Sequence, residues 1–162
     1  MAEWCRNTMI VRGGSHTLEQ FALALRECSF LNLLRPMPKH ESLNWREWRA
    51  ANWGTVSDVS ASEADITVDG GEMLVKFLSP WGPPTEAIRH HCRLEDSPKI
   101  YCIFFEPVNN FAGAAEDGHI VWGTSDIESY NRENSEDTDF KIISDSIGIA
   151  EYYRVRDGIG ST

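Results

Sequence analysis

The spacing of apolar residues divides the chain into short strand-like and helix-like runs. Residues 6–12 are rich in β-forming residues and end at Gly13-Gly14, which predicts a first strand and a turn. A helix is predicted next, with Ser15 or Thr17 as its cap. Its inward face carries apolar residues at three- and four-residue spacing: Leu18, Phe21, Ala22, Leu25 and Cys28.

The following stretch predicts a long connection anchored by tryptophan. Residues 30–34 fit either an extension of the first helix or a short strand, and the two prolines within 35–38 end any helix there. Residues 42–52 predict a short helix. Trp45 and Trp48 share one face of that helix because they lie three positions apart.

A hairpin is predicted where two β-type runs flank a tight-turn signal. Asp69-Gly70-Gly71 separates residues 66–68 from residues 72–78. A further β-type run covers residues 56–59. We therefore expect strands over these runs, with 66–68 and 72–78 paired.

Residues 79–84 form a proline-bounded corner around a tryptophan. Proline lacks a backbone N–H and fixes φ, so Pro80 ends the strand and the two prolines before Thr85 allow a second helix to begin there. The helix is predicted over residues 86–94, with Ile88, Cys92 and Leu94 facing inward. Trp81 is predicted to be a buried anchor whose truncation costs about 3–5 kcal/mol.

The strongest strand of the chain is predicted over residues 99–106, whose nearly continuous apolar character indicates burial on both sides. Asp117-Gly118 lies between the runs 112–115 and 119–123, which predicts a second hairpin. Residues 144–155 fit either a helix or a strand. The fold class is therefore α+β, with an antiparallel or mixed sheet, two main helices on one face, and spacing that suits a ferredoxin-like arrangement.

The length of 162 residues predicts a single domain, 1–162, with a sizeable core. The formal net charge is −10 and is uneven, because residues 116–162 hold eleven acidic side chains against four basic ones. Residues 125–140 are polar and acidic and are predicted to form a mobile loop. A negative field repels phosphate, so direct nucleic-acid binding is not expected.

The location is predicted to be the cytoplasm of a bacterial host. The first residues lack the basic-then-apolar layout of a signal peptide, and no apolar run is long enough for a membrane span. Four cysteines occur without a CxxC pair, which indicates reduced thiols.

No residue set predicts an enzyme site or a bound cofactor. Glu86 and His90 share a helix face, but His90 and His91 diverge by about 100°, which disfavours a metal site with Cys92. A Cys–His nucleophile pair lacks a local signature, and the chain has no phosphate-binding glycine motif. Four carboxylates near turns are interpreted as solvated or capping groups: Asp58, Asp65, Asp69 and Glu106.

Six tryptophans are many for a chain of this length, and they support two interpretations. The favoured one is that Trp4, Trp53 and Trp81 pack at loop corners, because buried aromatic rings contribute strongly to core stability. The alternative is an exposed aromatic patch at a partner interface, where tryptophan and arginine dominate binding energy.

Four short motifs resemble a known family, the YubB-type ferredoxin-like domains of phages and plasmids. In chain order they are Trp4-Cys5-x-Asn7, Trp53-Gly54-Thr55-x-x-Asp58, Trp81-Gly82-Pro83-Pro84 and Phe105-Glu106-x-x-x-x-Phe111-x-Gly113. The chain departs from the family at Val56-Ser57, where the family tends to have a lysine and a second tryptophan. The resemblance implies a ferredoxin-like fold and a mobile-element setting, and it implies no catalytic mechanism.

The function expected from these observations is a small mobile-element binding protein that covers a surface of a host protein. The most specific version of this hypothesis is an inhibitor that binds the basic surface of a host defence protein or of a nucleic-acid-handling protein. The predicted partner-binding residues are acidic: Glu128, Glu133, Glu136, Asp137 and Asp139. The alternatives are an enzyme or enzyme subunit acting on nucleotides or nucleic acid, and a structural or regulatory domain.

Overall fold

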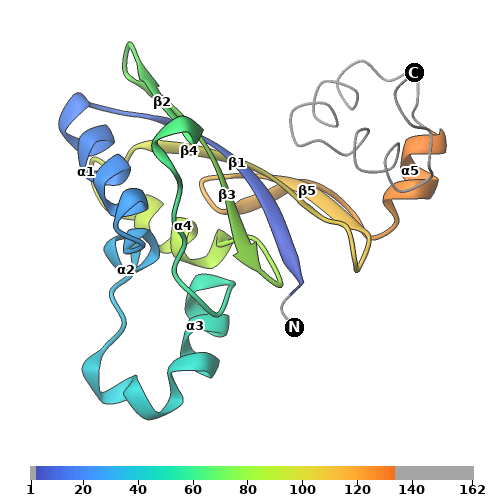
Figure 1. Cartoon of the computed structure of the whole chain (residues 1–162), viewed down its shortest axis with the longest axis horizontal. Helices are drawn as coiled ribbons and strands as arrows, with labels where there is room; N and C mark the ends of the chain where they lie inside the picture. Colours follow the sequence, from blue (N-terminus) through green and yellow to red (C-terminus); the bar gives the residue numbers. More distant parts are fainter. Residues whose placement is uncertain (1–2, 134–162) are drawn as a thin grey trace.

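The computed structural model describes residues 3–133 and has an α+β fold (Figure 1). Within these residues six strands form one antiparallel sheet. The strands are β1 (Trp4–Arg12), β2 (Ile66–Asp69), β3 (Glu72–Pro80), β4 (Lys99–Glu106), β5 (Phe111–Glu116) and β6 (His119–Thr124). The predicted α+β class is therefore confirmed.

The first strand lies inside the sheet, whose order is β2-β3-β1-β4-β5-β6. Met9 of β1 pairs with Val75 on one side and with Cys102 on the other. Both predicted hairpins are present, since β2 pairs with β3 and β5 pairs with β6. The end of the sheet at which β1 begins therefore lies next to the end of β3 and the end of β4.

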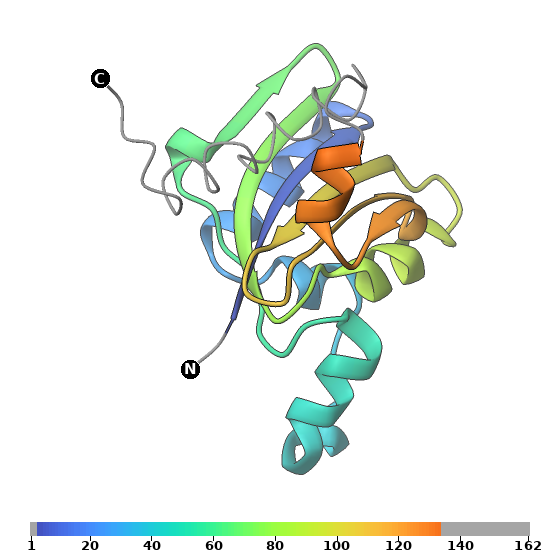
Figure 2. The same cartoon turned by 90° about the vertical axis from the view of Figure 1, so that its right-hand side faces the viewer.

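The helices occupy both long connections of the sheet and the last described segment. They are α1 (Ser15–Arg26), α2 (Phe30–Leu34), α3 (Trp45–Trp53), α4 (Thr85–Cys92) and α5 (Ile127–Glu133), with short 3-10 helices η1 (Lys39–Asn44) and η2 (Glu63–Asp65). Helices α1, α2 and α4 lie against one side of the sheet, and α5 lies near the other side (Figure 1). Helix α3 extends away from the rest of the molecule (Figure 2). Within residues 3–133, no helix has the length and apolar character needed to cross a bilayer.

The main core lies between the sheet and the helices. Alternate residues of β1 point into it, and Met9 and Val11 are fully buried. They pack against apolar residues of α1 and α4, among them Leu18, Leu25 and Ile88. Each such side chain contributes about 1.5–3 kcal/mol when it is buried completely, so this layer accounts for most of the hydrophobic stabilisation.

The opposite face of the sheet is only partly covered. Ile103, Phe105 and Ala114 pack there with Ile127, the first residue of α5, in a second apolar cluster. The part of the predicted loop 125–140 that the structure describes is thus helical over Ile127–Glu133 rather than a loop, because Ile127 anchors it to the sheet. Residues 134–140, and the predicted terminal element over 144–155, lie outside the described residues.

Several local predictions are wrong for identifiable reasons. Residues 30–34 form a separate helix, because Cys28 adopts a left-handed φ of 56° that ends α1 and leaves the thiol exposed. Helix α1 begins after Gly14 without a side-chain cap, so neither Ser15 nor Thr17 has the predicted role. Residues 56–59 join no strand. The second helix ends at Cys92, which leaves Leu94 exposed.

Candidate functional site

The motifs that carry the family resemblance meet at the end of the sheet where β1 begins. The buried amide of Asn7 donates hydrogen bonds to Ser79 Oγ at 2.8 Å and to the Cys5 carbonyl at 3.1 Å. The Ser79 hydroxyl in turn donates to the Gly82 carbonyl at 2.6 Å. These bonds fix the first strand to the proline corner, and every polar group in them is buried.

The second motif holds the end of α3 against the same corner. The Thr55 hydroxyl donates to the Pro80 carbonyl at 2.7 Å. Gly54 adopts a left-handed φ of 86°, and a Cβ atom at that position would lie 2.7 Å from the Pro83 carbonyl oxygen. Only glycine therefore permits this close approach of the two backbones.

The carboxylates of the motifs are structural. Glu106 is fully buried, and it accepts hydrogen bonds from the backbone N–H groups of Val108 at 2.8 Å and Asn109 at 2.7 Å. Asp58 accepts from the N–H groups of Leu31 at 2.7 Å and Asn32 at 3.0 Å, in the first turn of α2. Both groups satisfy backbone donors, as the interpretation of turn carboxylates as capping groups predicts.

Trp81 lies on the surface above this network. Its exposed fraction is 41%, and its backbone has a left-handed φ of 68°. A left-handed conformation costs a non-glycine residue about 1–2 kcal/mol. The Trp81 N–H donates to the Glu3 carbonyl at 2.6 Å, which holds the conformation in place. The fold thus maintains a strained backbone that leaves a large indole accessible to solvent.

Two arginines of α3 stack on the tryptophans of this region. The guanidinium of Arg46 lies 4.8 Å from the centre of the Trp81 ring. The guanidinium of Arg49 lies 5.0 Å from the ring of Trp45 and 4.8 Å from that of the buried Trp53. We call Trp45, Arg46, Arg49 and Trp81 the Trp–Arg surface. Three of its residues belong to the projecting helix α3 and the fourth follows β3. Figures 1 and 2 show where these two segments lie.

Trp53 is the buried residue that contacts Arg49 of the Trp–Arg surface. It is 1% exposed, its indole N–H donates to the Arg35 carbonyl at 2.9 Å, and its ring makes an edge contact with Trp48. Trp45 is 42% exposed beside it. The orientation of Arg49 is therefore fixed by one buried and one exposed ring.

The charge on the Trp–Arg surface is positive and is not neutralised locally. Within residues 3–133, neither Arg46 nor Arg49 forms an ion pair with a carboxylate. The ion pairs found there involve other residues: Arg12, Arg26, His40, Arg89 and Lys99. The Nε atom of Arg49 is buried without a hydrogen-bond partner among the described residues. Residues 35–54 contain four basic and two acidic side chains, in a chain whose net charge is −10.

The favoured interpretation of the tryptophans is wrong for two of three residues. Trp53 is buried as predicted, but Trp4 is 49% exposed and Trp81 is 41% exposed. Trp4 alternates with the buried Cys5 in β1, and Trp81 follows the last residue of β3, so neither side chain belongs to the main core. Both side chains are exposed, and the alternative interpretation, an aromatic patch at a partner interface, stays a prediction.

The predicted acidic site is described only in part. Glu128 lies within α5, and Glu133 is the exposed last residue of that helix. Glu136, Asp137 and Asp139 lie outside the described residues. The structure therefore does not bring the five residues together into a describable site, and their role stays a prediction.

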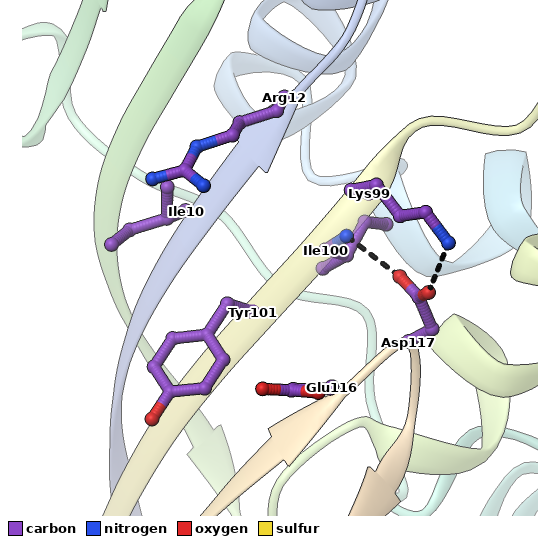
Figure 3. Close-up of a pocket in the computed structure, with 7 residues that line it drawn as sticks. All are labelled: Ile10, Arg12, Lys99, Ile100, Tyr101, Glu116 and Asp117. Carbon is purple, nitrogen blue, oxygen red and sulfur yellow. Dashed lines mark hydrogen bonds and ion pairs between the residues drawn. The ribbon is translucent and has the colours of Figure 1, made fainter.

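A shallow pocket of about 350 Å³ is lined by residues of β1, β4 and β5 (Figure 3). It lies where β1 ends and β4 begins, whereas the Trp–Arg surface lies near the start of β1. Three of the four charged side chains of the pocket form ion pairs, one of them with a residue outside the pocket. Asp117 accepts from the Ile100 N–H at 2.9 Å and from Lys99 Nζ at 3.1 Å, and Arg12 pairs with Glu72 at 2.8 Å. Such contacts stabilise strand ends, so this pocket is the weaker candidate for a functional site.

The ionisable groups of this pocket are shifted by burial and by these contacts. Burial alone would raise the pKa of Asp117, but the bond from Ile100 and the charge and bond of Lys99 outweigh it, so the pKa lies below its ordinary value. Burial, together with the nearby carboxylate of Glu116, raises the pKa of Tyr101. At neutral pH, Asp117 is thus a carboxylate held by its donors and Tyr101 is a neutral phenol, and neither is poised to exchange a proton.

The thiols and imidazoles do not form a reactive group among residues 3–133. Burial raises the pKa of Cys102 to about 12, and it also raises the pKa of Cys5 strongly. Burial and nearby cations lower the pKa of His90, and burial lowers that of His91. Glu86 pairs with an arginine of its own helix, and no cluster of three or more metal-ligating residues occurs in this part of the chain.

Sequence reasoning missed Arg46 and Arg49. The signal was the interleaved run Trp45-Arg46-Glu47-Trp48-Arg49, of which only the two tryptophans contributed to the prediction.

Comparisons of the chain with models of protein families, with curated protein sequences and with solved structures give no match.

Proposed function

We propose that this protein binds a host protein and acts by covering part of its surface, with the Trp–Arg surface as the contact. The observation that carries the proposal is Trp81, an exposed indole held on a left-handed backbone and stacked with Arg46. Strained, solvent-accessible residues cluster at functional sites, because a conformation of that kind persists only where the surroundings enforce it.

The residue types of the Trp–Arg surface fit a protein interface. Tryptophan and arginine are the residues most enriched among those that dominate binding energy at protein interfaces. Trp45 and Trp81 present apolar area, and each is orientated by a stacked guanidinium. Ordered side chains lose less conformational entropy when a partner binds, which increases the net affinity.

The proposal includes a ferredoxin-like fold with two main helices on one face, and an origin in a phage or another mobile element. The strand order β2-β3-β1-β4 supports the fold, because each helix-containing connection then passes over one intervening strand. The resemblance of four motifs to YubB-type domains, which are common on phages and plasmids, supports the setting. Four unpaired cysteines support a cytoplasmic location, where thiols stay reduced.

The acidic residues remain a second proposed contact. Glu133 is exposed, and the excess of acidic side chains after residue 115 would attract a basic partner surface. An inhibitor of a host defence or nucleic-acid-handling protein fits this charge. The enzyme alternative has weaker support, because Asp117 and Lys99 of the described pocket are paired with each other and Asp117 also binds a backbone N–H.

A quantitative pull-down from bacterial host lysate tests the proposal. The wild-type protein is compared with Trp81→Ala and with Leu23→Ala, which removes an exposed apolar side chain from α1. We expect a host protein that wild type and Leu23→Ala retain and that Trp81→Ala loses, while both variants stay folded. Equal retention by all three proteins would show that the Trp–Arg surface is not the contact.

A further inference from the structure

We infer that the Trp–Arg surface recognises a protein segment in which carboxylate side chains lie next to apolar ones. This inference rests on the proposed function and specifies the chemistry of the partner. Its basis is the pair Arg46 and Arg49, whose guanidiniums lie over indole rings and whose charges no described carboxylate neutralises.

Stacking leaves the hydrogen-bonding capacity of a guanidinium available. An arginine has five N–H donors, and a cation–π contact with an indole ring uses no hydrogen-bond acceptor to satisfy them. Arg46 is exposed at the surface and forms no hydrogen bond with a residue in the range 3–133, so its donors are accessible to a ligand. The Nε atom of Arg49 is buried, and Arg49 contributes mainly its charge. A planar oxyanion that accepts two parallel hydrogen bonds is the ligand that matches this geometry.

The neighbouring side chains require an apolar part in the same ligand. Trp45 and Trp81 are each about two-fifths exposed, and Leu43, just before α3, is 93% exposed. Burying these groups against apolar atoms of the partner is favourable by roughly 25 cal/mol for each Å² removed from water. A segment with alternating acidic and apolar residues would satisfy both requirements.

The charges favour a peptide carboxylate over a nucleic-acid strand. A phosphodiester chain gains its affinity from several basic contacts that release counterions. The Trp–Arg surface offers two unpaired guanidiniums in a chain of net charge −10, and that field opposes a polyanion. One face of each exposed indole is also covered by an arginine, which reduces the area on which bases could stack.

Titration with defined probes, followed through the indole N–H signals in ¹⁵N-correlated NMR spectra, tests this inference. The probes are a twelve-residue peptide of alternating Leu and Glu, the same peptide with Gln for Glu, and a twelve-nucleotide oligothymidylate. We expect the Glu peptide to shift the signals of Trp45 and Trp81. The Gln peptide should bind at least tenfold more weakly, because a guanidinium forms stronger hydrogen bonds with a carboxylate than with a neutral amide.

The variant Arg46→Gln provides a second readout on the same protein. It should weaken binding of the Glu peptide at least tenfold while leaving the signal of the buried Trp53 unchanged, which shows that the fold is intact. Arg46→Lys should recover only part of the affinity, because an ammonium cannot donate two parallel hydrogen bonds.

Three outcomes would overturn the inference. Equal binding of the Glu and Gln peptides would mean that the contact is apolar only, and tighter binding of the oligothymidylate would assign the surface to nucleic acid. Failure of the Glu peptide to shift Trp45 or Trp81 at millimolar concentration would exclude the proposed ligand chemistry. None of these depends on the host-lysate comparison, so the inference can fail while the proposed function holds.

Discussion

Replacing Trp81 by glycine and by alanine measures the strain that the proline corner maintains. The position has a left-handed φ of 68°, which an alanine also finds unfavourable and a glycine does not. Both substitutions remove the same indole, so the difference between them isolates the backbone. We expect the glycine variant to be the more stable of the two.

The magnitude follows from the exposure and the dihedral angle. Truncation of a buried tryptophan costs about 3–5 kcal/mol. Since Trp81 is 41% exposed, the cost of Trp81→Ala falls to about 2–3 kcal/mol, less than the sequence-based expectation. Relief of left-handed strain by about 1–2 kcal/mol outweighs the entropy cost of glycine of about 0.5–1 kcal/mol, so Trp81→Gly should be more stable than Trp81→Ala by roughly 0.5–1 kcal/mol.

Urea unfolding at 25 °C, followed by circular dichroism, provides the assay. The matched control is the same pair of substitutions at Leu23, an exposed residue inside α1. There glycine should be less stable than alanine by about 1 kcal/mol, because no left-handed angle favours it. If the two sites show the same order of stability, with alanine above glycine, the strain at Trp81 is refuted.

Three further perturbations have defined expectations. Trp53→Ala should cost about 3–5 kcal/mol in urea unfolding, because this ring is fully enclosed and its N–H is bonded; a loss below 1 kcal/mol would contradict that. Asp117 has a lowered pKa, so its stabilisation is present above its ordinary pKa of 3.8 and is lost as the pH falls through the folded value. Asp117→Asn should therefore flatten the stability profile on that acidic side, and an unchanged profile would count against the Ile100 and Lys99 contacts. Neutralising Glu133, Glu136, Asp137 and Asp139 together should slow partner association at low salt with little change in melting temperature, and unchanged rates would remove the acidic contact.

The sequence predicted the sheet well because its signals are local. Asp69-Gly70-Gly71 and Asp117-Gly118 supply the positive φ angles that tight hairpin turns require, and both hairpins are present. The apolar run of β4 is buried for the reason that its composition indicated. Turn residues and apolar runs can be recognised from neighbouring positions in the sequence, without information about contacts between distant segments.

The exposure of the tryptophans was not predictable from local pattern. Trp53 and Trp81 both stand next to a glycine in a loop or helix end, yet one is enclosed and the other is accessible. The difference arises from contacts between segments far apart in the chain, such as the Trp81 N–H with the Glu3 carbonyl and the Trp53 indole with the Arg35 carbonyl.

The candidate site was missed for a related reason. Net charge was compared only between long parts of the chain, which drew attention to the acidic residues after position 115. The short basic segment 35–54 does not stand out in such a comparison. Arg46 gains its significance only when the proline corner brings Trp81 beside it. An interleaved tryptophan and arginine pattern on a short helix would have been the available signal.

The most direct test of the central claim is the solvent accessibility of Trp81 in the complex with the captured host protein. Brief hydroxyl-radical oxidation followed by peptide mass spectrometry reports the reactivity of individual side chains, including tryptophan and leucine, and the free protein provides the reference. We predict that Trp45 and Trp81 are protected in the complex, while the exposed Leu23 of α1 keeps its reactivity. If Trp81 is oxidised equally in the free and bound protein, the Trp–Arg surface is not the partner contact.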